Sequence, residues 1–157
     1  MQWTAVGLFL ISGFVLFLTA GALWVGDWLP WTKFALPMTV NAAGLVLASF
    51  GFGLVVWATV AFGLFGHGTP LPLLPPKRLV TRGPYRFVRN PIYIGWLAGF
   101  GGAALLTGRL TFLGVGLILF TLAVLVGYWE RDATVSRLGP EFERWVRETP
   151  AFMPRRR

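Results

Sequence analysis

The sequence predicts an all-α integral membrane protein, a polytopic bundle of about four transmembrane helices followed by a short C-terminal interfacial helix. Of its 157 residues, 55% are hydrophobic and only 13% are charged, whereas soluble domains carry about 25% charged residues. Between residues 1 and 76, the only Asp, Glu, Lys or Arg residues are Asp27 and Lys33. A soluble domain could not give so long a stretch a charged face, so lipid is the expected environment.

Four apolar stretches are candidates for membrane-spanning helices, each of which needs about 20 residues to cross the hydrocarbon core. They are residues 3–25, 40–65, 91–107 and 110–129, within a single membrane domain that covers residues 1–157. Only Gly108 and Arg109 separate the third stretch from the fourth, so these two must form an antiparallel hairpin. Gly95 and Gly99, four residues apart on the short third stretch, offer a groove for close helix packing.

The positive charges indicate how the chain crosses the membrane. All Lys and Arg residues except Lys33 and Arg109 lie between the second and third stretches or after the fourth. The positive-inside rule places both groups on the cytoplasmic side, together with both termini. Because this topology explains the net charge of +8, membrane lipids are expected partners and nucleic acid is not.

The C-terminal segment, residues 130–157, contains a further short helix. Pro140 is suited to the first position of that helix, and Glu143 and Arg147 are spaced to form an ion pair along it. Trp145 is expected to rest the helix on the membrane surface.

The densest cluster of polar and aromatic residues is the segment 77–95, KRLVTRGPYRFVRNPIYIG. Its cations are interleaved with aromatic residues that include Tyr85 and Tyr93, and Asn90 with Pro91 is a typical helix start. Cations, aromatic rings and a helix N-terminus together suit a flat, polar, partly anionic ligand. The alternative is a solvated positive loop, which explains the cations but not the aromatic residues.

Two isolated titratable residues are further candidates. Glu130 ends the fourth stretch, at a depth where a carboxylate is costly; it either pairs with a neighbouring arginine or binds a positive or hydroxyl-bearing part of a ligand. His67, the only histidine, either lies at the interface or acts as a general base. With one histidine and no cysteine, no metal site is expected.

Three parts of the sequence together resemble the isoprenylcysteine carboxyl methyltransferase family, and more broadly the membrane methyltransferases that include phospholipid N-methyltransferases. These parts are the run LVTRGPYRFVRNPIYIG, the glutamate about 35 residues later, and LGPEFERWVRETPAFMPR. The segment HGTPLPLLPP, residues 67–76, resembles a proline-rich segment of the bacterial branch of that family. The resemblance covers about residues 65–155 and implies a bacterial inner membrane protein with a cytoplasmic active site.

The resemblance also implies the chemistry. S-adenosylmethionine is the expected cofactor, and the expected acceptor is a lipophilic or membrane-embedded small molecule methylated on O, N or S. Arg89 is the candidate catalytic residue, which would orient an anionic acceptor, and His67 is a candidate substrate contact. The cofactor contacts of the family fall on Lys77, Arg78, Leu79, Val80, Tyr85, Asn90, Pro91, Ile92, Tyr93 and Glu130.

Three positions depart from the family pattern. Asn90 stands where the family has a histidine, so proton transfer through that position is not expected. Arg131 replaces the second acid that usually follows the position of Glu130. Val126 stands where eukaryotic members have a substrate-binding arginine, so a prenylcysteine carboxylate is not the expected acceptor.

Two other functions fit parts of the sequence. One is an NADPH-dependent membrane reductase related to sterol reductases, in which Lys77 and Arg78 would bind a 2′-phosphate. Such reductases are usually much longer than this chain. The other is a non-enzymatic membrane scaffold whose basic loop holds anionic lipids.

Overall fold

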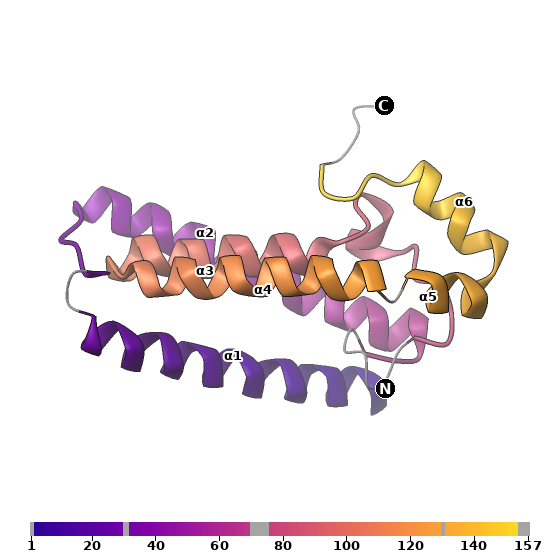
Figure 1. Ribbon diagram of the computed structural model, residues 1–157, viewed down its shortest axis with the longest axis horizontal. Helices are drawn as coiled ribbons and strands as arrows, with labels where there is room; N and C mark the ends of the chain where they lie inside the picture. Colours follow the sequence, from indigo (N-terminus) through magenta and orange to yellow (C-terminus); the bar gives the residue numbers. More distant parts are fainter. Residues whose placement is uncertain (1, 30–31, 70–75, 130, 154–157) are drawn as a thin grey trace.

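The computed structural model of the protein describes residues 2–29, 32–69, 76–129 and 131–153 (Figure 1). Three helical segments are long and apolar enough to cross a membrane, and one apolar helix is shorter. The prediction of an all-α membrane bundle is confirmed. The helices in chain order are α1 (Gln2–Trp28), α2 (Met38–Ala61), the π-helix η2 (Phe62–Gly66), the 3-10 helix η3 (Gly83–Arg86), α3 (Pro91–Thr107), α4 (Leu110–Trp129), α5 (Arg131–Leu138) and α6 (Pro140–Glu148).

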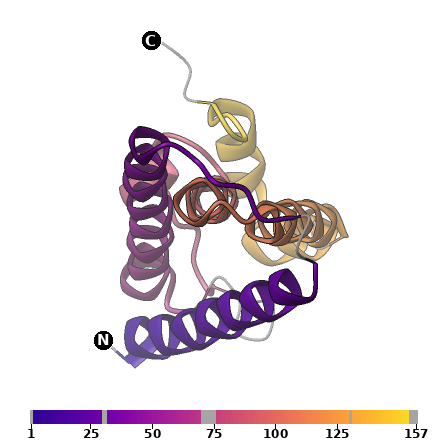
Figure 2. The same ribbon diagram turned by 90° about the vertical axis from the view of Figure 1, so that its left-hand side faces the viewer.

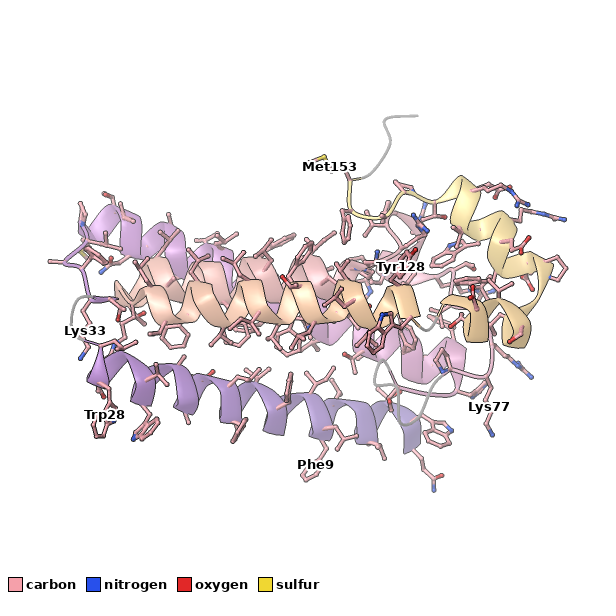
Figure 3. All side chains as sticks on the ribbon, in the orientation of Figure 1. Phe9, Trp28, Lys33, Lys77, Tyr128 and Met153 are labelled. Atoms are coloured by element: carbon pink, nitrogen blue, oxygen red, sulfur yellow. The ribbon has the colours of Figure 1, made fainter. Side chains whose placement is uncertain are left out.

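The four long helices alternate in direction, so their connections gather at two ends of the bundle (Figure 1). One end, here called the turn end, holds the loop after α1 and the turn between α3 and α4. The other, here called the motif end, holds residues 76–90, α5 and α6. Lys33 and Lys77 mark these opposite ends (Figure 3). The basic segment before α3 and the helices after α4 therefore lie at the same end, as the charge pattern predicts.

Helices α2 and α3 pack backbone against backbone because glycine lines both surfaces. A Cβ added to Gly95 would lie 2.8 Å from the carbonyl oxygen of Gly51, and a Cβ on Gly51 would overlap the backbone of Gly99. A Cβ on Gly102 would likewise overlap the backbone of Ala48. In lipid, where helices gain nothing from excluding water, such close approach is a main source of helix association.

The hydrophobic core lies along α3, which sits between α2 and α4 when the bundle is viewed from the turn end (Figure 2). Phe100 is fully buried. Its ring lies 5.8 Å from that of Trp96, 5.4 Å from that of Phe52 on α2 and 6.4 Å from that of Phe112 on α4. This aromatic cluster therefore joins α2, α3 and α4.

A carboxylate fastens the turn end. Asp27, near the end of α1, accepts from Lys33 Nζ at 2.7 Å and from Arg109 Nη1 at 2.9 Å. Gly108 takes the left-handed conformation that ends α3, and its carbonyl accepts from the Phe34 amide at 2.8 Å. These bonds join α1, the following loop and the α3–α4 turn, and each of the two cations of this end is paired with the same carboxylate within the protein.

Candidate active site

The segment at the start of the predicted motif is hydrogen-bonded to the end of η2. The carbonyl of Gly66 accepts from the amides of Lys77 and Arg78, at 2.9 Å and 3.3 Å. His67 leaves this point in the left-handed conformation and is exposed. A Cβ on Gly66 would lie 2.8 Å from Val80 Cγ2, so Val80 packs directly against it. The start of the motif is thus held against the end of η2. The backbone of Lys77 and Arg78 is fixed by these hydrogen bonds, and their side chains are exposed.

The short helix η3 turns Tyr85 into the protein. Gly83 begins η3 with a positive φ of 63°, and Pro84 fits the first turn because it needs no amide donor. Tyr85 is only 4% exposed, and its ring lies edge-on to Phe62 at 4.9 Å. Burial, with a smaller contribution from Tyr93, raises the pKa of Tyr85 well above its usual value. The side chain is therefore a neutral phenol at physiological pH.

The start of α3 is paired with the C-terminal segment. The Arg89 amide donates to the carbonyl of Pro150 at 2.9 Å, and the Asn90 amide donates to that of Ala151 at 3.2 Å. Asn90 occupies the N-cap and Pro91 the first turn, as the sequence predicts, but the Asn90 side chain makes no capping hydrogen bond. That side-chain amide is therefore not used to satisfy α3 and is suited to binding a ligand.

Tyr93 brings α3 to the last turns of α4. Its hydroxyl lies 3.3 Å from the position that a Cβ on Gly127 would occupy, so glycine at that point leaves room for the phenol. Gly127 lies one turn before Glu130 in sequence. Glu130 itself lies outside the residues that the structure describes.

Helix α6 covers the motif from the C-terminal side. Glu143 and Arg147 form the predicted pair along it, at 3.9 Å. Trp145, which was predicted to rest the helix on the membrane surface, is half-buried and packs against the core cluster that includes Val80 and Tyr85. Its Nε1 atom is enclosed and has no hydrogen-bond partner within the described part of the chain. An enclosed donor beside the motif is a group that a ligand could satisfy.

The structure brings part of the predicted site together. Val80, Tyr85 and Ile92 belong to one buried cluster, and Tyr93 packs against it. The remaining predicted residues are Lys77, Arg78 and His67, which are exposed; Leu79, Arg89 and Asn90, which are half-buried; and Pro91, which is buried. Sequence reasoning did not assign Gly127, Trp145 or the carbonyls of Pro150 and Ala151 to the site. For the last three, the C-terminal part of the family resemblance was the available signal.

Comparison with known proteins gives the membrane methyltransferase family that the sequence resembles. Residues 39–141, from α2 to the start of α6, match the family model described as phospholipid methyltransferase. The methanethiol S-methyltransferase of Pseudomonas sp. (strain GM41(2012)) is 32% identical over 125 residues, which are 72% of this chain and 46% of that protein. Methanethiol S-methyltransferase 1 of Bradyrhizobium diazoefficiens is 33% identical over 126 residues, 74% of this chain and 43% of that protein.

A third relative carries a different kind of name. The nickel-cobalt-cadmium resistance protein NccN of Alcaligenes xylosoxydans xylosoxydans is 29% identical over 138 residues, 88% of this chain and 57% of that protein. The chain thus spans about half the length of these three curated relatives. The family model, by contrast, matches most of this chain, including both helices that frame the motif. The chain therefore belongs to the phospholipid methyltransferase family.

Proposed function

We propose that this chain is an S-adenosylmethionine-dependent membrane methyltransferase that acts on a lipophilic or membrane-embedded small acceptor. The observation that carries the proposal is the convergence at the motif end. There, the start of α3 meets the last turns of α4 through Tyr93 and Gly127, beneath a C-terminal segment bound to Arg89 and Asn90. This convergence brings polar groups of the family motif together at the end of an apolar bundle.

The residues present suit the cofactor. S-adenosylmethionine consists of a flat adenine on a ribose that is joined to an amino acid, and it supplies an activated methyl group on a sulfonium. Among the described residues, two polar groups beside the motif are available to a ligand: the Asn90 side-chain amide, which does not cap α3, and the enclosed Trp145 Nε1, which has no hydrogen-bond partner there. The exposed cations Lys77 and Arg78 suit the cofactor's carboxylate. Buried Tyr85 forms part of the apolar wall behind the motif.

The proposed cofactor contacts otherwise remain those that the family resemblance implies. They are Leu79, Val80, Pro91, Ile92, Tyr93 and Glu130. The protein's work in such a reaction is to align the acceptor with the methyl group and to exclude water. No covalent enzyme intermediate is required, which agrees with a chain that has no cysteine and one histidine. Arg89 would orient the acceptor, and His67 would contact it from the loop that starts at Gly66.

Among O, N and S acceptors, we favour a thiol. Asn90 cannot titrate, so the position that is a histidine in the family provides no base here. A thiol needs less help than an alcohol, because thiols are much stronger acids than alcohols; the thiol of free cysteine, for example, ionises with a pKa of about 8.5. Two relatives are named as methanethiol S-methyltransferases, which makes methanethiol the first acceptor to test.

The test is binding followed by turnover. Purified protein is titrated with S-adenosylmethionine or NADPH while its thermal unfolding is followed, because a ligand that binds only the native state raises Tm. S-adenosylmethionine should raise Tm, and the rise should be lost in Tyr93→Ala and Glu130→Ala. Tyr128→Ala is the matched control, since Tyr128 is 75% exposed on the same end of α4 and should keep the full rise. Methyl transfer to methanethiol is then measured with isotopically labelled cofactor.

Each alternative function has its own outcome in this test. A rise in Tm with NADPH and none with S-adenosylmethionine would support the reductase. No rise in Tm with either ligand would leave the non-enzymatic membrane scaffold as the remaining function. An unchanged rise with S-adenosylmethionine in both Tyr93→Ala and Glu130→Ala would overturn the site assignment while leaving the cofactor in place.

A further inference from the structure

Two arginines at the motif end lie over aromatic rings instead of pairing with carboxylates. The guanidinium of Arg82 is 5.3 Å from the centre of the Phe65 ring, and that of Arg86 is 4.8 Å from the centre of the Phe87 ring. Both arginines and both rings are exposed. Within the described part of the chain, neither arginine forms an ion pair. A guanidinium that lies over a ring is not an acceptor's partner there, so its N–H groups stay available to an anion.

The turn end provides a contrast within the same molecule. There, Lys33 and Arg109 share the carboxylate of Asp27, at 2.7 Å and 2.9 Å. At this end, therefore, both cations have a carboxylate partner within the protein. At the other end it holds Arg82 and Arg86 in place with their charges uncompensated by described residues, so an external anion is the expected partner.

The position of these arginines indicates which anion. Gly83, next to Arg82, lies against α2: a Cβ on it would be 3.3 Å from Ala61 Cβ and 3.4 Å from Trp57 Nε1. Trp57 is 51% exposed. Phe65 is in the last turn of the candidate membrane span Met38–Gly66. The arginines thus lie where an apolar, outward-facing helix surface ends, which is where lipid headgroups begin.

We propose that these residues bind the phosphate of an anionic phospholipid at the motif end. The surface, here called the headgroup patch, consists of Trp57, Phe65, Arg82, Arg86 and Phe87. Arginine binds phosphate oxygens with two parallel N–H groups, and an indole N–H at the interface can add a third donor. The exposed apolar side of α2 would hold the acyl chains of the same lipid, which soluble phosphate lacks. The headgroup patch is therefore expected to bind a lipid and not soluble phosphate.

The headgroup patch is separate from the proposed cofactor site. The single turn of η3 sends Tyr85 into the core and leaves Arg82 and Arg86 on the surface on either side of it. The turn η3 would therefore separate a bound lipid, on its outer surface, from the proposed cofactor site on its inner side. The proposal does not depend on the methyltransferase assignment, and the two can fail independently.

The test compares lipid binding by the intact protein and by charge variants. Native mass spectrometry counts phosphatidylglycerol and phosphatidylcholine bound to protein released from mixed micelles, with glycerol phosphate as the soluble competitor. One basic residue near an anionic surface contributes about fivefold in affinity, so Arg82→Gln with Arg86→Gln should weaken phosphatidylglycerol binding about 25-fold. Arg144→Gln, which removes one exposed cation from α6, should leave binding near the wild-type level. Arg82→Lys with Arg86→Lys, which keeps the charge but loses the planar fork, should give an intermediate result.

Two further arms distinguish a lipid held on this patch from a soluble anion and from general attraction to positive charge. Phe65→Leu keeps an apolar side chain but removes the ring under Arg82, and should weaken phosphatidylglycerol binding by several fold. Glycerol phosphate should not displace the lipid at equal concentration. Equal phosphatidylglycerol binding by wild type and the double Gln variant would overturn the proposal, as would an equal loss in Arg144→Gln or full displacement by glycerol phosphate. Circular dichroism and elution volume report whether each variant has folded.

Discussion

The backbone amide of Arg89 donates a 2.9 Å hydrogen bond to the carbonyl of Pro150, a residue that lies beyond α6. With the bond from Asn90 to Ala151, it satisfies two donors at the start of α3, where the helix itself offers no acceptor. Phe152 continues the contact, since its ring lies 5.4 Å from that of Phe120 on α4. Residues 149–153 are therefore part of the bundle and close over the start of the helix that carries Tyr93.

Truncation tests this relationship. Ending the chain after Glu148 removes the carbonyls that accept from the amides of Arg89 and Asn90, at a cost of about 1 kcal/mol for each hydrogen bond lost. We expect a lower Tm and loss of the rise in Tm with S-adenosylmethionine. Ending the chain after Met153 is the control, because it keeps both hydrogen bonds and Phe152. If both truncated proteins bind the cofactor like wild type, the segment has no part in the site.

Gly127 tests the space left for Tyr93. Gly127→Val places a branched side chain where the Tyr93 hydroxyl now lies 3.3 Å from an added Cβ, so the phenol must move. We expect the Kd for S-adenosylmethionine to rise about tenfold or more, corresponding to about 1.4 kcal/mol or more. Gly114→Val on the same helix is the control, since an added Cβ there meets nothing within 4 Å. Equal Kd values in the two variants would show that Tyr93 does not contact the cofactor.

The interface between α2 and α3 makes a prediction about stability. Gly51→Val forces a side chain into the backbone of Gly99, and we expect Tm to fall steeply or folding to fail, because overpacking costs about 1–3 kcal/mol or more. Gly53→Val, two residues along the same helix, places its Cβ in open space and should change Tm little. Thermal unfolding in detergent, followed by far-ultraviolet circular dichroism, measures both. Similar losses would mean that valine in α2, and not its contact with α3, is responsible.

Tyr85 makes a prediction about pH. Its folded-state pKa is raised by burial, so above pH 10 the unfolded chain releases a proton that the folded chain keeps. The stability associated with Tyr85 is fully present below about pH 10 and is lost as pH rises, by up to about 1.4 kcal/mol per pH unit. Tyr85→Phe removes this group, so Tm should fall less steeply between pH 9.5 and 11 than in wild type. Parallel slopes would indicate that the phenol ionises equally in both states.

The sequence predicts the parts of this fold that depend on local composition. The apolar stretches predict the helices, and Gly95 and Gly99 predict a packing surface on α3. The partner of that surface, Gly51, was not predicted, because glycine is common in membrane helices and its spacing alone does not identify a neighbour. Similarly, Asn90 and Pro91 predict where α3 starts, but not that backbone carbonyls from residues 150 and 151 satisfy it. Such contacts join distant backbone groups and leave no pattern of side chains.

Trp145 illustrates the same limit on the C-terminal helix. Aromatic and charged residues at helical spacing predict an amphipathic helix, and α6 is one. The pattern does not distinguish an apolar face on lipid from one on protein, and the structure packs Trp145 against the core. Which surface the apolar face of α6 meets depends on the turn at Gly139, between α5 and α6. Gly139 has a positive φ of 70°.

The shortness of α3 has a consequence for enzymology. Its 17 residues span about 25 Å, less than the hydrocarbon thickness of about 30 Å. A bilayer thins beside so short a helix, or one end of the helix lies below the headgroups. We expect that end to be the start of α3, which would place acyl chains at the depth of the proposed site. An acceptor dissolved in those chains reaches the site at its concentration in the lipid phase. Apparent KM values per litre of buffer should therefore scale with the amount of lipid in the assay, and they should become constant only when expressed as mole fraction in the bilayer.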